Sequence, residues 1–248
     1  MSEYSGFLNV LKPPGMTSAR VVGMVRRLTG GAKVGHAGTL DPEAAGVLPL
    51  MLGKAARLFD YMQDKRKAYI AEVAFGSATD TQDAQGLAVE TGEAYPDQAA
   101  LEALLPRFVG EITQVPPMYS ALKRDGRRLY DLARQGKTVA LEARPATVYG
   151  LRLVGLTPRH GALLEVSCAK GFYVRTLCHD LGRAAGCPAH MRFLLRTQSG
   201  PFTLENAVTL EELAAAAEAG ALAALLLPME LALERYPRAE VPARYEKP

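Results

Sequence analysis

The sequence lacks the marks of a secreted or membrane protein. Residues 1–4 contain no basic region followed by an apolar run, so no signal peptide is predicted. The longest apolar-rich tract, residues 220–233, is interrupted by a proline and a glutamate and cannot span a bilayer. The cysteines Cys168, Cys178 and Cys187 form no close pair, which favours reduced thiols. We therefore expect a soluble cytoplasmic protein that makes no membrane contact.

Motifs for cofactors are missing as well. The chain has no Gly-x-Gly-x-x-Gly, which argues against a dinucleotide site, and no Gly-x-Ser-x-Gly nucleophile elbow. The glycine and lysine at residues 53–54 lack the spacing of a phosphate loop, and Ala55 stands where a metal-binding hydroxyl would be needed. The cysteines and histidines between residues 168 and 190 match no zinc-ligand spacing. We expect neither a cofactor nor a metal.

The overall charge does not by itself predict a polyanion-binding protein. The net charge is only +3, from 29 basic and 26 acidic residues, so any basic face must come from local clustering. Such a cluster lies between Tyr119 and Lys137, with two tyrosines among its charges. Its basic residues are Lys123, Arg124, Arg127, Arg128, Arg134 and Lys137. A run of this kind is usually a solvated face, but the interleaved aromatics favour a loop that contacts RNA phosphates.

The order of the expected elements indicates an α+β fold with a mixed, mostly antiparallel sheet. Alternating or continuous apolar runs predict strands at residues 7–11, 47–52, 67–75, 110–115, 147–156, 162–169 and 191–196. Helical periodicity predicts helices at residues 17–28, 54–63, 97–108, 173–185 and 210–227. The two kinds of element mix without regular β-α-β alternation, which argues against a parallel sheet.

The stretch at residues 35–49, GHAGTLDPEAAGVLP, is the first candidate for a functional loop. Its three glycines and two prolines require several special backbone dihedrals. Asp41 has a plain structural explanation, because Asp-Pro-Glu is typical of a helix start with aspartate as the N-cap. However, Gly46 and Pro49 leave room for a single helical turn at most, and His36 lies in the same loop. We therefore also consider Asp41 as a catalytic carboxylate.

Arg175 and Tyr69 each admit two interpretations. On the helix predicted after Tyr173, Arg175 projects about 160° away from the apolar stripe through Leu177, at roughly 100° per residue. Such an arginine is usually a surface charge, but in a cleft it could hold the carboxylate of Asp41. Tyr69 lies in the middle of a strand, where an aromatic side chain normally packs in the sheet, although it could also stack on a nucleobase.

Taken together, these residues resemble a known family, the bacterial tRNA pseudouridine-55 synthases of the TruB type. Six blocks carry the resemblance, and they follow one another in the order in which the family has them. They are NVLKPPGMTS at residues 9–18, GHAGTLDPEAAGVLP at 35–49, KAY at 67–69, GSATDTQDAQG at 76–86, PPMYSALKRDGRRLY at 116–130 and KGFYVRT at 170–176. Six ordered motifs are too many for coincidence.

The resemblance implies a fold and a domain organisation. It implies the pseudouridine synthase fold, a central sheet flanked by helices, with an insertion at about residues 116–146 that clasps RNA. Residues 1–205 would form the catalytic domain, and residues 206–248 a helical C-terminal segment. Family members usually continue into a small C-terminal RNA-binding module of the PUA type. A complete module of this type is not expected within residues 206–248, so either the protein lacks it or this sequence is a truncated form. We expect a monomer without an obligate protein partner.

The resemblance also implies an activity: the isomerisation of one uridine in the T-loop of tRNA to pseudouridine, without a cofactor. The catalytic residues would be Asp41, Tyr69 and Arg175, with Tyr69 stacking on the flipped uracil and Arg175 holding Asp41. His36 would fill the space that the base leaves. The substrate-binding residues would be His36, Lys12, Tyr173, Leu194, Lys123, Arg127 and Arg128, of which Lys12, Lys123, Arg127 and Arg128 would hold phosphates of the T-arm stem-loop.

Two alternative functions would use the same RNA-binding residues. The first is a tRNA-folding chaperone that acts by binding alone, for which Asp41 would not be needed. The second is a related synthase that modifies another RNA. The joint presence of Asp41, Tyr69 and Arg175 argues against binding as the sole activity.

Overall fold

The structure is a computed structural model that describes residues 4–63, 66–119, 123–124, 127–128, 139–234 and 236–237. The insertion expected at residues 116–146 lies partly outside this part of the chain, which leaves out residues 120–122, 125–126 and 129–138. Within it, the two-residue strands β8 (Lys123–Arg124) and β9 (Arg127–Arg128) pair as a small antiparallel hairpin. No helix in the described part of the chain is long and apolar enough to cross a membrane.

One large sheet organises the molecule, and its strand order is β1-β3-β12-β4-β11-β10-β7, with β2 paired to β3 and β13 paired to β12. Its strands are β1 (Gly6–Lys12), β2 (Val34–His36), β3 (Ala45–Leu52), β4 (Lys67–Phe75), β7 (Gly110–Gln114), β10 (Arg144–Thr157), β11 (Gly161–Cys168), β12 (Ala189–Ser199) and β13 (Phe202–Thr203). A separate two-stranded sheet joins β5 (Ser77–Thr79) to β6 (Ala88–Thr91). The pairing of β12 with β3 is parallel, and the other pairings of the large sheet are antiparallel. The predicted α+β class with a mixed, mostly antiparallel sheet is confirmed.

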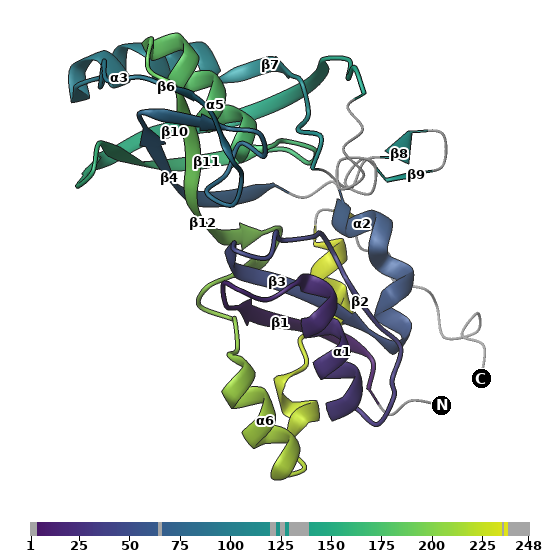
Figure 1. Cartoon of the computed structure of the whole chain (residues 1–248). Coiled ribbons are helices and arrows are strands. Elements are labelled where there is room, and N and C mark those ends of the chain that lie inside the picture. Colours follow the sequence, from purple (N-terminus) through teal and green to yellow (C-terminus); the bar gives the residue numbers. More distant parts are fainter. Residues whose placement is uncertain are drawn as a thin grey trace.

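β12 joins the two halves of this sheet (Figure 1). It pairs with β4 along most of its length but with β3 through only two residues, Leu195 and Arg196. Gly46 permits this contact, because a side-chain carbon on it would lie 2.2 Å from the carbonyl oxygen of Arg196. β1 and β3 therefore lie on one side of β12, and β4, β11, β10 and β7 lie on the other.

The helices cover these two halves. α1 (Ser18–Leu28) and α6 (Leu210–Glu218) lie beside β1–β3, with α2 (Phe59–Gln63) on the same side, whereas α3 (Gln98–Leu104) and α5 (Val174–Ala185) cover the β4–β11–β10 half (Figure 1). α1 begins where the Thr17 hydroxyl accepts a hydrogen bond from the Arg20 amide, and it buries Val21 and Val25. α5 ends at Gly186, whose φ of 72° needs glycine.

The strand predictions agree with the structure better than the helix predictions do. The strand expected at residues 67–75 has the observed bounds of β4. The helix expected at residues 54–63 is a 3-10 helix, Gly53–Leu58, followed by the short α2, and that expected at residues 97–108 ends as the 3-10 helix Leu105–Phe108. The single helix expected at residues 210–227 is wrong. α6 stops before Gly220, which has a φ of +65°, and shorter 3-10 turns follow at Leu222–Leu225 and Met229–Leu233.

Candidate active site

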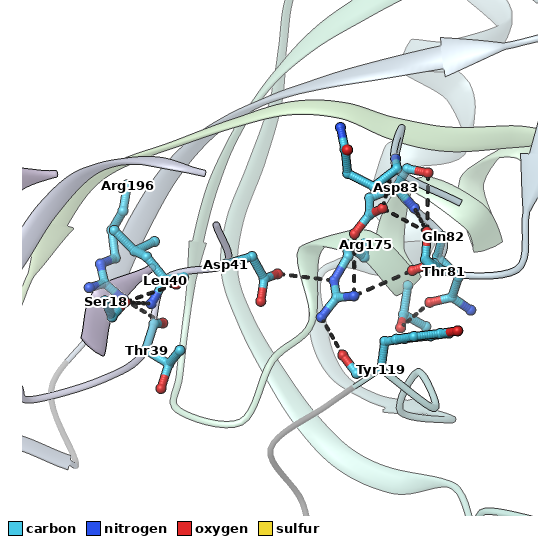
Figure 2. Close-up of polar contacts among 12 residues, drawn as sticks. Ser18, Thr39, Leu40, Asp41, Thr81, Gln82, Asp83, Tyr119, Arg175 and Arg196 are labelled. Atoms are coloured by element: carbon cyan, nitrogen blue, oxygen red, sulfur yellow. Dashed lines mark hydrogen bonds and ion pairs between the residues drawn. The ribbon is translucent and has the colours of Figure 1, made fainter. Parts of the chain in front are cut away.

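The loop between β2 and β3 carries Asp41. Side chains from other elements form hydrogen bonds with the backbone of this loop (Figure 2). The Ser18 hydroxyl both donates to the Leu40 carbonyl and accepts from the Leu40 amide, each at 2.9 Å. Ser18 is buried at the start of α1, so the helix fixes the residue that precedes Asp41. The Pro42 carbonyl, on the other side of Asp41, accepts from Lys12 at 2.9 Å and from the Met16 amide at 3.2 Å. The position of Asp41 is therefore set by neighbours on both sides.

Asp41 does not cap a helix. Residues 42–43 form a turn, closed by a 3.1 Å hydrogen bond from the Ala44 amide to the Asp41 carbonyl, and no helix follows. The helix-start interpretation of Asp-Pro-Glu is wrong because the chain enters β3 at Ala45, directly after this turn. The carboxylate of Asp41 is left free for another contact.

That contact is with Arg175. Its Nε lies 3.1 Å from Oδ2 of Asp41, so the pair predicted from the sequence is present (Figure 2). The Arg175 side chain is 8% exposed, whereas the Asp41 side chain is 40% exposed. The alternative of a solvated Arg175 on the helix surface is wrong, because the loop at residues 76–86 covers this face of α5. A buried cation thus holds one oxygen of a carboxylate that remains open to solvent.

Arg175 is itself anchored by the loop that follows β4 (Figure 2). Its Nη1 lies 3.4 Å from Oδ2 of Asp83 and 3.4 Å from the Thr81 carbonyl, and its Nη2 donates to the Tyr119 carbonyl at 2.9 Å. Asp83 is held in turn at Oδ1 by the Thr81 hydroxyl at 2.7 Å and by the Gln85 amide at 3.0 Å. No role was predicted for Asp83, although it lies in one of the six motif blocks. Its partner could only be found in the structure.

Tyr69 reaches the same loop from β4. Its ring is buried, and the guanidinium of Arg196 lies next to its hydroxyl. Burial raises the pKa of the Tyr69 phenol to about 12, and the nearby charge of Asp41 acts in the same direction. Tyr69 and Arg196 are cross-strand partners on β4 and β12, so their side chains share one face of the sheet. Asp41, Tyr69 and Arg175 are therefore brought together.

Arg196 is a site residue that the sequence did not reveal. It is 1% exposed, and its three donor nitrogens bind backbone carbonyls: Nε to Val47 at 2.7 Å, Nη1 to Thr39 at 3.3 Å and Nη2 to Gly38 at 3.1 Å. The sequence around Arg196 does not indicate that its guanidinium is buried, because the carbonyls that accept its hydrogen bonds belong to a distant loop. Arg196 therefore holds the loop backbone at Gly38 and Thr39, just before Asp41.

Lys12 requires a correction. We expected it to hold a phosphate, but it is 0% exposed, and its ammonium group donates to the carbonyls of Pro13, Met16 and Pro42 at 2.8, 2.6 and 2.9 Å. All three of its protons are thus in use inside the protein. Burial lowers its pKa to about 8. In this structure Lys12 braces the Asp41 loop and offers no surface charge to RNA.

The other predicted substrate residues lie around the same region. His36 ends β2 with its Nδ1 buried and without a hydrogen-bond partner among the described residues, and burial lowers its pKa. Leu194 lies two residues before Arg196 on β12, on the same face as Tyr69, and is 7% exposed. Tyr173 precedes α5, where its amide and carbonyl are both bound by the side chain of Gln114.

The side chains of Lys123, Arg127 and Arg128 lie outside the part of the chain that the structure describes, so their predicted phosphate contacts stay predictions. The backbone pairs Lys123 with Arg128 across the β8–β9 hairpin. Tyr119, near the start of the expected insertion, accepts a hydrogen bond from Arg175 at its carbonyl. The insertion therefore begins directly at the predicted catalytic pair.

The arrangement suits a reaction that needs one positioned carboxylate. An anchored guanidinium orients the carboxylate of Asp41, a buried aromatic ring lies beside it, and the loop backbone that carries it is held by Ser18, Lys12 and Arg196. Such preorganised positioning is what nucleophilic or general-base catalysis by a carboxylate requires.

Comparisons with known proteins agree with this description. Residues 26–174 match the family model "TruB family pseudouridylate synthase (N terminal domain)", and residues 175–234 match "tRNA pseudouridylate synthase B C-terminal domain". A curated tRNA pseudouridine synthase B from Symbiobacterium thermophilum is 50% identical over 246 residues, which cover 98% of this chain and 80% of the relative. One from Pelotomaculum thermopropionicum is 46% identical over 238 residues, covering 94% of this chain and 75% of the relative.

Solved structures show the same fold. The Cbf5 chain of a Cbf5-Nop10-Gar1 complex superposes with a TM-score of 0.73 at 32% identity, over 92% of this chain. A Cbf5 chain from an archaeal box H/ACA sRNP Nop10-Cbf5 complex gives a TM-score of 0.70 at 29% identity, over 93% of this chain. This chain spans 61% of the length of each of these two chains.

Proposed function

The chain belongs to the TruB family of pseudouridylate synthases, and on this premise we propose that it isomerises the uridine at position 55 in the T-loop of tRNA to pseudouridine. The curated relatives are named for a tRNA substrate, which supports tRNA as the partner. The T-loop position follows from the resemblance of the motif blocks. We further propose that the chain acts as a cytoplasmic monomer.

The reaction is an isomerisation, so its atoms balance within the substrate. The N1–C1′ glycosidic bond breaks, the uracil turns, and C5 forms a bond to C1′. The proton on C5 leaves and N1 gains one, so no electrons are exchanged with another molecule. The protein must therefore supply a nucleophile or base, a place for the detached base, and groups that move a proton.

In this proposal Asp41 is the catalytic carboxylate. The observation that carries it is the contact between Asp41 and Arg175, in which a buried guanidinium orients a carboxylate that is still 40% exposed. This pair keeps the carboxylate accessible to a substrate and fixes its direction.

Tyr69 and His36 serve the flipped base. The target uridine must leave its stack in the T-loop to reach Asp41, and we assign the Tyr69 ring to stacking against the uracil. The imidazole of His36 is kept neutral by burial, which suits a ring that fills the vacated space between bases. Leu194 adds an apolar contact on the same face of the sheet as Tyr69.

The proposed catalytic domain, residues 1–205, includes both sides of the Asp41–Arg175 pair. β12 and β13 end before residue 205, and α6 with its 3-10 turns forms the proposed C-terminal segment. The boundary between the two matched family models, at residues 174 and 175, falls inside the site. Both matched regions are therefore needed to build the catalytic pair.

The test compares RNA substrates. The protein is incubated with an isolated T-arm stem-loop, with full tRNA and with a ribosomal RNA fragment, and pseudouridine is mapped in each. We expect conversion of one T-loop uridine in the first two RNAs and none in the third. Conversion of the ribosomal fragment alone would identify a synthase for another RNA. Binding and refolding of tRNA without conversion would identify the chaperone alternative.

A further inference from the structure

Lys67, the first residue of β4, lies on the floor of the candidate site. It is two residues before Tyr69, so the two side chains point to the same face of the sheet. Its cross-strand partners are Cys168 on β11 and Ser199 on β12. Tyr69 is flanked in the same way by Val166 and Arg196. Lys67 therefore belongs to the same surface of the sheet as the predicted base platform.

The ammonium group of Lys67 reaches the catalytic loop. A side-chain carbon on Gly38 would lie 3.5 Å from Nζ of Lys67 and 3.7 Å from Nη1 of Arg196. Gly38 lies three residues before Asp41 and has a φ of 129°, which an L side chain rarely adopts. The absence of a side chain at this position lets two cationic groups approach the loop together.

Lys67 is half-buried, and the part of the chain described here offers it no carboxylate within ion-pairing distance. Its charged or titratable neighbours are the guanidinium of Arg196, whose three nitrogens each donate to a backbone carbonyl, and the buried thiol of Cys168. The hydroxyl of Ser199, its cross-strand partner, is buried and has no hydrogen-bond partner within the described ranges. Burial and Arg196 lower the pKa of Lys67 to about 8. An unpaired cation in such a place costs stability, and a bound anion would compensate this cost.

We propose that Lys67 binds a phosphodiester oxygen of the flipped target nucleotide. The inference rests on the proposed function, because it takes RNA as the substrate. Uracil is neutral before the reaction, whereas the RNA backbone brings one negative charge with each nucleotide. For Asp41 to reach the sugar or the base of the target uridine, the phosphates on either side of that ribose must enter the same region. Among the described residues, Lys67 is the cation there whose ammonium group has neither an ion pair nor a hydrogen bond. Arg175 is paired with Asp41, and Arg196 and Lys12 donate to backbone carbonyls.

The closing experiment places a neutral linkage at the target nucleotide. Two T-arm stem-loops carry a methylphosphonate in place of the phosphate on the 5′ or the 3′ side of the target uridine, and binding to wild type and to Lys67→Met is measured. We expect one of the two RNAs to bind wild type about tenfold more weakly, as for a lost charge-assisted hydrogen bond. Lys67→Met should bind the natural RNA with the same loss and should not distinguish it from that methylphosphonate RNA.

A second measurement uses salt. The slope of log affinity against log salt should fall by about one for Lys67→Met, and it should be unchanged for Lys54→Met, an exposed lysine outside the site.

Because the methylphosphonate test can be read in wild type alone, a poorly folded variant does not decide the result. If wild type binds both methylphosphonate RNAs as well as natural RNA, the inference is overturned. An unchanged KM with a reduced kcat in Lys67→Met would also overturn it, because that pattern places the lysine on the reacting base. Failure of wild type to form pseudouridine would contradict the proposed function instead, and the binding measurements would still judge Lys67.

Discussion

Arg175 and Asp41 lie 3.1 Å apart, but they are held to very different degrees. The guanidinium has further contacts to Thr81, Asp83 and Tyr119, and it is nearly buried. The carboxylate is held through the backbone on either side of it and is 40% exposed. The fixed partner of this pair is the arginine, and the partner available to a substrate is the aspartate. The predictions below concern Asp41 and three residues near it, Asp83, Arg196 and Lys67.

The first concerns Asp41→Asn. Asparagine keeps the shape of the side chain and can still accept from Arg175, but it is neither a nucleophile nor a base. We expect pseudouridine formation to fall on the order of 10²–10⁴-fold, while affinity for a T-arm stem-loop and the melting temperature stay close to wild type. Glu43→Gln removes a neighbouring exposed carboxylate and serves as the matched control, with turnover unchanged. An active Asp41→Asn variant would refute the catalytic assignment.

The second concerns Asp83→Asn, which removes the other carboxylate on Arg175. The guanidinium then keeps the Thr81 and Tyr119 carbonyls but loses a charged anchor, so its alignment with Asp41 loosens. We expect turnover to fall about 10- to 100-fold at nearly unchanged RNA affinity. The control is Asp80→Asn in the same loop, because asparagine can still accept from the Leu87 amide as Asp80 does. Equal losses of turnover in the two variants would contradict a positioning role for Asp83.

The third concerns Arg196→Met. The substitution leaves the carbonyls of Gly38, Thr39 and Val47 buried without their donors, so we expect the free energy of unfolding to drop by about 3 kcal/mol. Urea unfolding measures this change. Arg192→Met on the same strand removes a partly exposed pair with Glu72 and should cost less than about 1 kcal/mol. If the two variants lose the same stability, Arg196 does not hold the loop.

The fourth concerns the pH dependence of stability in Lys67→Met. The pKa of Lys67 is lowered from 10.5 to about 8 in the folded protein, so folded and unfolded chains both bind the proton below pH 8, and the cost of the buried charge is then complete. Between pH 8 and 10.5 the unfolded chain binds more protons, and the free energy of unfolding of wild type rises with pH. Lys67→Met lacks this rise. It should be more stable than wild type at pH 7, on the order of 1 kcal/mol after solvent screening, and the gap should close toward pH 10.

Urea unfolding of both proteins at pH 7, 8, 9 and 10 checks this prediction. Lys12 also has a pKa lowered to about 8, but it is present in both proteins and its contribution cancels in the difference. A gap that does not change with pH would show that Lys67 carries no burial cost. A variant that is more stable but binds RNA more weakly would show that the buried charge is kept for the substrate.

The strands were predictable from the sequence because their signal is local. Alternation between Tyr69 and Phe75 defined β4 without reference to any other element. The helices were less predictable at their ends, because a single glycine can end a helix. Gly220 adopts a left-handed φ, and the alanine-rich pattern on either side of it gives no sign of this.

The site was predictable only in part. The glycines and prolines of residues 35–49 identified the loop, but local chemistry favoured a helix cap for Asp41 and a surface position for Arg175. The resemblance to a family corrected both interpretations. No role was predicted for Arg196, Asp83 or Lys67, because their partners come from distant segments. The alternation of residues along β12 and β4 does not show which charged side chain is buried against which loop.

β12 lies between β3 and β4 in the sheet, yet the ribosome makes it long after both. A nascent chain that ends before residue 189 therefore has β3 and β4 but lacks the strand that joins them. It also lacks Arg196, and with it three of the hydrogen bonds that hold the loop around Asp41. Because contacts so far apart in sequence form late, we expect the enzyme to gain activity only after the chain has been made through β12.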